Sequence, residues 1–372
     1  MKEQLKKIIK AINGIIPKND KKIILESSPD FSDNAKVIYE YLLENGKKDY
    51  QYIWVVNNYE KYKDKKTKKL KFITKKRIIS YLYHVFTSKY ILYGNNGVIL
   101  TNINKQVVVN LTHGMPFKSS KGLLQNDEDF TYLVSTSDEI SPILAGEFYS
   151  TAKKCIVSGL PRNDVLFGNY KEAEEVVKDF DKFILWLPTY KKHKDFENSV
   201  TEDYSPVPLF TNEELLKLNE NLKEKNFLLI LKFHPAQDLS LLDSNSLTNI
   251  YLWKNEELVD RELDLYKLMS KADALITDYS SVSADYLLTD RPIAYIQNDK
   301  SEFGDKRGFC FDNIDEMSPG HKIKNTKDFN NFMEDLYNNK DKYKKDRKRV
   351  RDFYHKYQDG SSTKVLMDFL GL

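Results

Sequence analysis

Short apolar runs alternate along the chain with longer segments in which apolar residues recur at helical spacing. In the first half, the runs predict strands at Lys22–Leu25, Tyr52–Val56, Tyr90–Tyr93, Val107–Leu111, Tyr132–Thr136 and Ile156–Val157. Helical spacing predicts helices at Asn34–Glu44 and Arg77–Phe86. Asp33 is the expected N-cap of the first of these helices, and Gly46 is its expected stop.

The same alternation continues in the second half. Strands are expected at Phe183–Leu187, Phe227–Leu231, Ile250–Trp253, Ala274–Thr277 and Ile293–Ile296. Helices are expected at Glu213–Lys223, Leu263–Ser270, Ser283–Leu288 and Asp328–Asn338, followed by one long C-terminal helix from about Lys340. Nearly continuous apolar strands between helices indicate parallel sheets covered on both faces, and hence an α/β fold. Because 372 residues exceed one ordinary core, we expect two doubly wound domains facing a cleft, joined in the polar segment 169–181.

The composition is that of a globular protein. Hydrophobic residues make up 41% of the chain and charged residues 30%, which excludes a disordered chain. Two cysteines, Cys155 and Cys310, allow at most one disulfide and lack metal-ligand spacing, so a reducing, cytoplasmic location is favoured. The histidines outside the motifs described below show no metal-ligand spacing either, and we expect neither a metal nor a cofactor.

Positive charge is clustered, although the formal net charge is only +3. Lys61–Arg77 and Lys340–Arg351 are basic runs. Most charge runs are solvated surface, and the alternative is attraction to an anionic surface such as membrane lipid or a phosphate-rich polymer. Nucleic acid is disfavoured as a partner, because no signature of a nucleic-acid-binding fold accompanies the charge.

Residues 2–16 form a candidate amphipathic helix. Its apolar residues fall on one helical face, namely Leu5, Ile8, Ile9, Ile12, Ile15 and Ile16, and Lys2, Lys6, Lys7 and Lys10 lie elsewhere. No apolar run approaches the ~20 residues of a membrane-spanning helix, and the interrupting lysines argue against a signal peptide. Because periodicity does not reveal what an apolar face contacts, the helix either lies in a membrane interface or packs on the domain.

The segment from Leu275 to Ser281 predicts a buried strand that ends in a polar turn before a helix. Ser280 or Ser281 would lie at the helix start, where backbone N–H groups and the helix dipole favour an anion. Strand–turn–helix units are where doubly wound domains bind phosphates. Two serines before a helix are more often a simple cap, so this motif gains weight from two histidine motifs upstream.

The first histidine motif, Thr112-His113-Gly114, follows an expected strand. It places His113 at the carboxyl edge of a parallel sheet, where α/β proteins bind ligands, and imidazole suits a general base near neutral pH. Gly114 permits a sharp turn or close approach to a ligand, and Lys118 follows nearby. A single histidine at a strand end is more often structural, but the design occurs twice.

The second histidine motif is Lys232-Phe233-His234-Pro235. Lys232 and His234 share one strand face, because side chains alternate along a strand, and a pair of cations aimed at a cleft suits a diphosphate. The structural alternative is an edge-strand histidine beside a solvated lysine. Thr189 is a weaker candidate for donating to a phosphate, and Arg162 lies in a turn that by itself indicates only a domain-closing loop.

In this order, the motifs resemble the CDP-glycerol glycerophosphotransferase family, the teichoic acid primases and polymerases. The matching segments are His113-Gly114 with Pro116 and Lys118, residues 159–164, residues 188–190, His234-Pro235, residues 277–281 with Asp285, residues 305–309, and Asp359-Gly360 with the two serines that follow. The resemblance implies a GT-B-like architecture of two Rossmann-like domains. Residues 1–168 would form the acceptor-side domain, residues 169–345 the CDP-donor domain, and residues 346–372 a C-terminal helix packing back on the first.

The resemblance also implies an activity. Glycerol phosphate would pass from CDP-glycerol to a hydroxyl of a lipid-linked or glycan acceptor, in teichoic acid or capsule-type polymer synthesis, with release of CMP. The catalytic residues would be His113, as the base, and His234. The donor-binding residues would be Gly114, Lys118, Arg162, Thr189, Lys232, Asp278, Ser280, Ser281 and Asp285. The enzyme would work at the cytoplasmic face of the cell membrane, held peripherally by an anionic lipid surface.

Three alternatives stay open. The donor could carry ribitol or another polyol, or the chain could be a sugar-nucleotide glycosyltransferase of the same fold. Release of CMP rather than a nucleoside diphosphate distinguishes polyol-phosphate transfer from glycosyl transfer. The alternative outside enzymes is a binding protein for anionic glycan or membrane, which absence of turnover with every CDP donor would favour.

Overall fold

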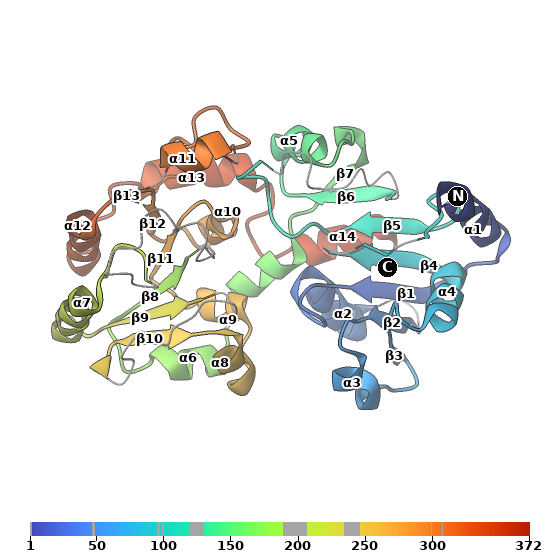
Figure 1. Cartoon of the computed structure of the whole chain (residues 1–372), viewed down its shortest axis with the longest axis horizontal. Helices are drawn as coiled ribbons and strands as arrows, with labels where there is room; N and C mark the ends of the chain where they lie inside the picture. Colours follow the sequence, from blue (N-terminus) through green and yellow to red (C-terminus); the bar gives the residue numbers. More distant parts are fainter. Residues whose placement is uncertain are drawn as a thin grey trace. The chain divides into compact units, whose positions relative to one another are not determined.

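The computed structural model of the chain describes residues 2–46, 49–94, 97–98, 100–119, 130–188, 207–233, 246–298, 300–306 and 308–372. The chain forms two compact units (Figure 1). Unit 1 comprises Met1–Pro116, Ser120–Asp164 and Phe353–Leu372, and unit 2 comprises Phe117–Ser119 and Val165–Asp352.

Unit 1 is built on a parallel sheet with the strand order β3-β2-β1-β4-β5-β6-β7. The strands are β1 (Asn19–Glu26), β2 (Gln51–Val55), β3 (Leu70–Ile73), β4 (Ser88–Tyr93), β5 (Val107–Asn110), β6 (Tyr132–Ser135) and β7 (Cys155–Val157). Central strands are buried along most of their length, as Ile23, Ile24 and Leu25 of β1 show with no exposed surface. The order reverses between β1 and β4, the point at which doubly wound domains bind ligands.

The helices of unit 1 lie between these strands in the sequence, except that the first helix precedes the first strand and the last helix is the last element of the chain. They are α1 (Lys2–Ile15), α2 (Asp33–Asn45), α3 (Tyr59–Tyr62), α4 (Ile78–Thr87), α5 (Ile140–Glu147) and α14 (Ser362–Leu370), with short 3₁₀ turns at Lys63–Lys65 and Ala152–Lys154. A further 3₁₀ segment, Pro161–Phe167, spans the boundary between the units. Gly46 ends α2 as expected, where its N–H donates to the Leu42 carbonyl.

Unit 2 has its own parallel sheet, in the order β10-β9-β8-β11-β12-β13. The strands are β8 (Lys182–Leu187), β9 (Phe227–Lys232), β10 (Ile250–Trp253), β11 (Ala274–Thr277), β12 (Ile293–Ile296) and β13 (His321–Ile323). The helices are α6 (Lys171–Val177), α7 (Asn212–Glu224), α8 (Asn255–Asp260), α9 (Leu265–Met269), α10 (Val282–Tyr286), α11 (Lys300–Lys306), α12 (Thr326–Tyr337) and α13 (Lys344–Tyr354), with a 3₁₀ turn at Leu287–Thr289. Here the order reverses between β8 and β11.

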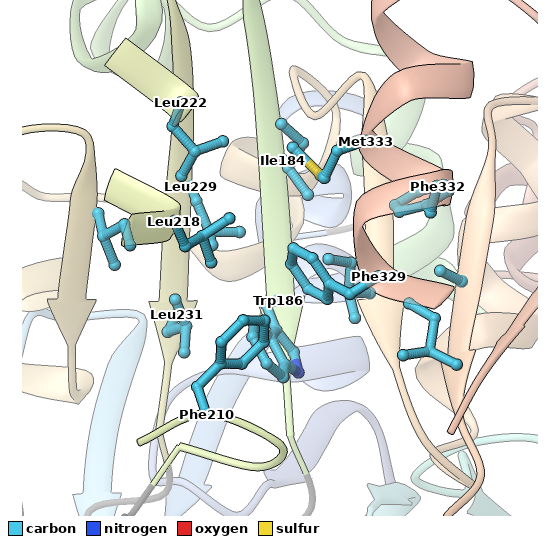
Figure 2. Close-up of a cluster of buried hydrophobic side chains, with 14 of the residues drawn as sticks. Ile184, Trp186, Phe210, Leu218, Leu222, Leu229, Leu231, Phe329, Phe332 and Met333 are labelled. Carbon is cyan, nitrogen blue, oxygen red and sulfur yellow. The ribbon is translucent and has the colours of Figure 1, made fainter. Parts of the chain in front are cut away.

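The core of unit 2 lies between its sheet and the helices α7 and α12 (Figure 2). Leu218 and Leu222 of α7 pack over β9, and Phe329 of α12 packs against Trp186 of β8 with ring centroids 5.5 Å apart. This core takes alternate residues of each strand, such as Ile184 and Trp186 of β8, because side chains alternate between the two faces of a sheet. The neighbouring Phe183 and Leu185 are also buried, so the strand is covered on both faces, which explains the continuous apolar runs in the sequence.

The prediction of an α/β fold with two parallel, doubly wound sheets is confirmed. One predicted element is wrong, because the expected long C-terminal helix is two helices, α13 and α14, separated by residues 355–361. Gly360, with φ +76°, lies in this turn and allows the chain to change direction.

Two strands, β3 and β13, were not predicted. Lys71 of β3 lies within a lysine-rich run, and β13 begins with His321 and Lys322, so neither strand has a continuous apolar run. The divisions between the units also differ from the expected ranges. The chain passes from unit 1 to unit 2 after Asp164 and returns to unit 1 after Asp352. The short segment Phe117–Ser119 also belongs to unit 2.

Candidate active site

His113 follows β5 at the carboxyl edge of the unit 1 sheet. A short turn delivers it there, because the N–H of Thr112 donates to Oδ1 of Asn110 at 2.9 Å and Thr112 takes the left-handed conformation with φ +58°. Gly114 continues the turn with φ +156°. The imidazole side chain keeps 57% of its surface exposed, so a ligand can reach it.

The main partner of His113 is Asp33, the first residue of α2. Asp33 Oδ2 lies 3.0 Å from His113 Nδ1, and Asp33 Oδ1 lies 3.0 Å from an Nη of Arg162. Burial alone would raise the pKa of Asp33, but the charge of Arg162 and the contacts with His113 together lower it to about 2. Asp33 is therefore an ionised carboxylate near neutral pH, shared between an imidazole and a guanidinium.

The expectation that Asp33 is the N-cap of α2 was wrong. Ser32 is the N-cap, and Asp33 is the first helical residue with φ +58°, a conformation rare outside glycine. The conformation turns the carboxylate toward His113 and Arg162, although it also accepts the N–H of Asn34 at 2.8 Å.

Asn34, the next residue, is completely enclosed and joins the same three segments. Its Nδ2 donates over 3.4 Å and 3.3 Å to the carbonyls of Leu111 and Thr112, just before His113. Its Oδ1 accepts the backbone N–H of Arg162 at 3.0 Å. The loop after β1, the turn after β5 and the turn after β7 are thereby fixed relative to one another within unit 1.

Arg162 was expected to bind the donor. The structure places its guanidinium, with 7% of the side chain exposed, against Asp33 in unit 1. Its position is therefore that of a buried counterion to Asp33, beside the candidate base.

The polar turn of unit 2 follows β11, as the sequence predicted. Thr277 Oγ1 donates to the carbonyl of Leu187 at 2.9 Å, which ties the ends of β11 and β8 together where the strand order reverses. Asp278, Ser280 and Ser281 are partly exposed in this turn. Ser281 is the N-cap of α10, but its hydroxyl makes no capping hydrogen bond.

Lys118 lies on unit 2, although it follows His113 by only five residues. It forms an antiparallel bridge with Phe309, flanked by a hydrogen bond of 3.1 Å from Ser119 N–H to the Gly308 carbonyl. Phe117 packs in one buried cluster with Tyr279, the residue before Ser280. The cluster brings the segment of Lys118 to the neighbourhood of the polar turn, which no local pattern in the sequence indicates.

Other predicted donor residues have different surroundings. Lys232 ends β9, and burial lowers the pKa of its ammonium, with Glu256 acting in the opposite direction. Asp285 has no exposed surface, and its Oδ2 accepts the hydroxyl of Tyr266 at 2.5 Å. Asp285, expected among the donor-binding residues, thus contacts α9, and its part in donor binding stays a prediction. Thr189 and His234 lie outside the described residues.

The structure thus gathers His113, Gly114 and Arg162 in unit 1, and Lys118, Lys232, Asp278, Ser280, Ser281 and Asp285 in unit 2. Sequence reasoning missed Asp33 and Asn34. The available signal was the position of Asp33 after the first strand of a doubly wound domain, but an acidic residue before a helix is usually a cap. Within the described ranges, no group of three His, Cys, Asp or Glu side chains could hold a metal ion.

Known proteins resemble this chain over most of its length. The teichoic acid poly(glycerol phosphate) polymerase of Bacillus spizizenii is 28% identical over 98% of this chain and 95% of its own. The teichoic acid ribitol-phosphate primase of the same species is 26% identical over 65% of this chain and 59% of its own. A solved structure of a variant of the wall teichoic acid polymerase TagF, after a 15-minute soak with CDPG, covers 98% of this chain and 93% of its own with a TM-score of 0.72 and 21% identity.

The TagF likeness agrees with the two doubly wound sheets and shows a GT-B-like fold. A family model, described as CDP-glycerol:poly(glycerophosphate) glycerophosphotransferase, matches residues 8–371. The chain therefore belongs to the CDP-glycerol:poly(glycerophosphate) glycerophosphotransferase family.

Proposed function

We propose that this glycerophosphotransferase moves glycerol phosphate from CDP-glycerol to a hydroxyl of a teichoic acid acceptor, releasing CMP. The observation that carries the proposal is the exposed imidazole of His113, held through Nδ1 by an ionised carboxylate. With Nδ1 engaged, Nε2 is the nitrogen free to take a proton. The acceptor hydroxyl attacks the phosphorus that bears the glycerol, its proton passes to His113, and the bond to CMP breaks.

General base catalysis by His113 supplies about 10²–10⁴-fold of the rate, and positioning and charge supply the rest. The hydroxyls of Ser280 and Ser281, the ammonium groups of Lys118 and Lys232, and His234 bind the diphosphate. Thr189 and Asp278 complete the donor contacts, and the Gly114 backbone allows close approach. Support comes from the position of the polar turn at the carboxyl edge where strand order reverses, and from the CDPG soak of the related polymerase.

The donor is tested by comparing CDP-glycerol, CDP-ribitol and a UDP-sugar with lipid-linked and glycan acceptors. We expect acceptor-dependent CMP release with CDP-glycerol. Faster release with CDP-ribitol would assign the chain to the ribitol branch, for which one relative is named. Release of UDP instead, or absence of turnover with every donor, would contradict the proposal.

We further propose that the enzyme works at the cytoplasmic face of the membrane, held peripherally by anionic lipid. No helix among the described residues is long and apolar enough to cross a bilayer. On α1 the buried contact is polar, because Asn13 is fully buried and its Nδ2 donates to the Leu100 carbonyl and to Gln106 Oε1. Ile8, Ile12 and Ile15 of the same helix are 57%, 46% and 82% exposed. The exposure of these three isoleucines supports a partner for α1 other than unit 1.

A further inference from the structure

The contact between Asp33 and His113 has the geometry of a carboxylate that orients a catalytic imidazole. Asp33 Oδ2 and His113 Nδ1 are 3.0 Å apart, and 13% of the Asp33 side chain is exposed against 57% of the His113 side chain. An ionised carboxylate can only accept a hydrogen bond. The neutral imidazole must therefore carry its proton on Nδ1, which leaves Nε2 as an unprotonated acceptor.

The surroundings of Asp33 fix its carboxylate from the other side. Arg162 occupies Oδ1 at 3.0 Å, so the carboxylate is not free to rotate or to take up a proton near neutral pH. Arg162 is held in turn through its backbone N–H by Asn34. The same Asn34 side chain contacts the carbonyls of Leu111 and Thr112, so one amide sets the spacing between the carboxylate and the imidazole.

The backbone around both residues takes uncommon conformations. Phe31, Asp33 and Thr112 all have positive φ, of 55°, 58° and 58°. For a β-branched residue such as Thr112 this conformation is an outlier, and such strain collects at functional sites. Asp30, in the same loop, makes a separate contact with the segment after β2, since its carboxylate accepts the backbone N–H groups of Asn57 and Asn58 at 2.8–2.9 Å.

We infer that Asp33 is a positioning residue for the transfer reaction, which sets the tautomer and ring orientation of His113 and is itself held ionised by Arg162. The inference rests on the proposed function in one respect, the role of His113 as the base. Asp33 stabilises the imidazolium that forms when His113 takes the acceptor proton, and it returns to the same ion pair when the proton leaves. Asp33 touches neither substrate.

The first test needs no variant. In ¹⁵N-histidine-labelled wild-type enzyme, the resonances of His113, assigned by their loss in His113→Ala, should show a protonated Nδ1 and an unprotonated Nε2 in the neutral ring. A neutral ring protonated on Nε2 would overturn the inference even if the enzyme is fully active. Absence of CMP release with every donor would instead overturn the proposed function and leave this measurement unaffected.

The second test separates positioning from folding. Asp33→Asn should lower kcat by about 10²-fold or more with little change in KM for the CDP donor. Without the carboxylate, the neutral His113 ring is no longer held with its proton on Nδ1, so Nε2 cannot accept the acceptor proton, and general base catalysis contributes ~10²–10⁴-fold to the rate. Asp33→Glu keeps a carboxylate and should recover part of the loss. Asp30→Asn, in the same loop, is the matched control and should reduce stability while keeping kcat within about threefold and the tautomer unchanged.

If Asp33→Asn fails to fold, the wild-type spectrum and Asp33→Glu still decide the question. Equal losses of kcat in Asp33→Asn and Asp30→Asn, with the Nδ1 proton retained in both, would reduce Asp33 to a structural residue.

Discussion

Asp164 and Thr363 are joined by a hydrogen bond of 2.7 Å, from the backbone N–H of Thr363 to the carboxylate, across 199 residues of chain. The other carboxylate oxygen accepts the N–H of Ser362 at 2.9 Å. Asp164 therefore caps the first turn of α14, the last helix. Asp164 itself lies in the turn after β7, where the chain leaves unit 1 for unit 2. Gly159 in that turn has φ +83°, and a side chain there would collide with Ser362.

The cap predicts a stability effect without a catalytic one. Asp164→Ala should lower the free energy of unfolding by about 1–2 kcal/mol, the usual cost of losing a side-chain cap. The chain around α14 should also become more accessible to protease. Urea unfolding and limited proteolysis measure both, with Asp368→Ala, exposed at the other end of α14, as the control. A loss of CMP release at unchanged stability would mean that Asp164 acts on substrate instead.

The stability of the protein should depend on pH through the protonation of His84. This residue is buried in α4, and burial, with the charges of Lys22 and Lys71, lowers its pKa to about 4. The folded state therefore favours neutral His84, so its stabilising contribution is complete above the unfolded pKa near 6.5 and is lost as pH falls from there toward 4. Between pH 7 and pH 5 the loss should be about 1 kcal/mol, allowing for solvent screening.

Urea unfolding of the wild type and of His84→Asn at several pH values checks this. The variant should be less stable at pH 7 but should change less with pH over this range. Parallel pH curves for the two proteins would show that His84 is not the group responsible.

The fold was largely predictable because its strands are locally distinct. Ile250–Trp253, Ala274–Thr277 and Ile293–Ile296 occur as expected, since each is a short apolar run between polar turns. The break between α13 and α14 was missed, although Asp359-Gly360 marks it. Those residues were interpreted as part of a family pattern rather than as the turn that they form.

The candidate site was only partly predictable, for a physical reason. His113 could be identified from its place at a strand end, which is a local feature. Asp33 lies 80 residues before His113 and 129 before Arg162, and only the folded sheet brings them together. An aspartate just before a helix is usually an N-cap, so the sequence alone does not indicate that the Asp33 carboxylate contacts His113 and Arg162 instead.

His113→Ala should reduce CMP release by at least ~10²-fold, because the general base is lost. It should largely spare donor binding, because the donor residues we propose lie mostly in unit 2. Steady-state assays and calorimetry with CDP-glycerol measure the two effects, and His321→Ala, in β13, serves as a histidine control. Near-normal turnover by His113→Ala would remove this residue from the mechanism.

The double substitution Ser280→Ala and Ser281→Ala should weaken CDP-glycerol binding by roughly 30-fold or more. Each lost hydroxyl removes a hydrogen bond to phosphate worth about 1 kcal/mol or more. The two hydroxyls make no capping bond to α10 of usual length, so the fold should persist. Calorimetry decides, with Ser283→Ala as the control that loses a hydroxyl bonded to the Ser280 carbonyl at 2.8 Å. An unchanged affinity of the double variant would move the donor site elsewhere.

The exposed isoleucines of α1 predict how the enzyme meets a membrane. Sedimentation with anionic vesicles should show binding that weakens as salt is added, since each basic residue near an anionic surface contributes about 1 kcal/mol. Exposed basic side chains can supply this attraction, among them Lys7 on α1 and Lys76 and Arg77 just before α4. Neutral vesicles should bind much less.

The apolar contribution is separated by Ile8→Asp with Ile12→Asp. Because these side chains are already exposed, the substitutions should leave the fold intact. They should weaken vesicle binding at least tenfold, since inserting an isoleucine into lipid is worth roughly 1.5–3 kcal/mol. Val259→Asp, at a 61% exposed position in unit 2, is the matched control and should bind as the wild type does. Equal binding by all three proteins would show that α1 is not the contact, because an interfacial helix must lose affinity when its inserted side chains become charged. Salt-independent binding by the wild type would show that the basic residues do not supply the attraction.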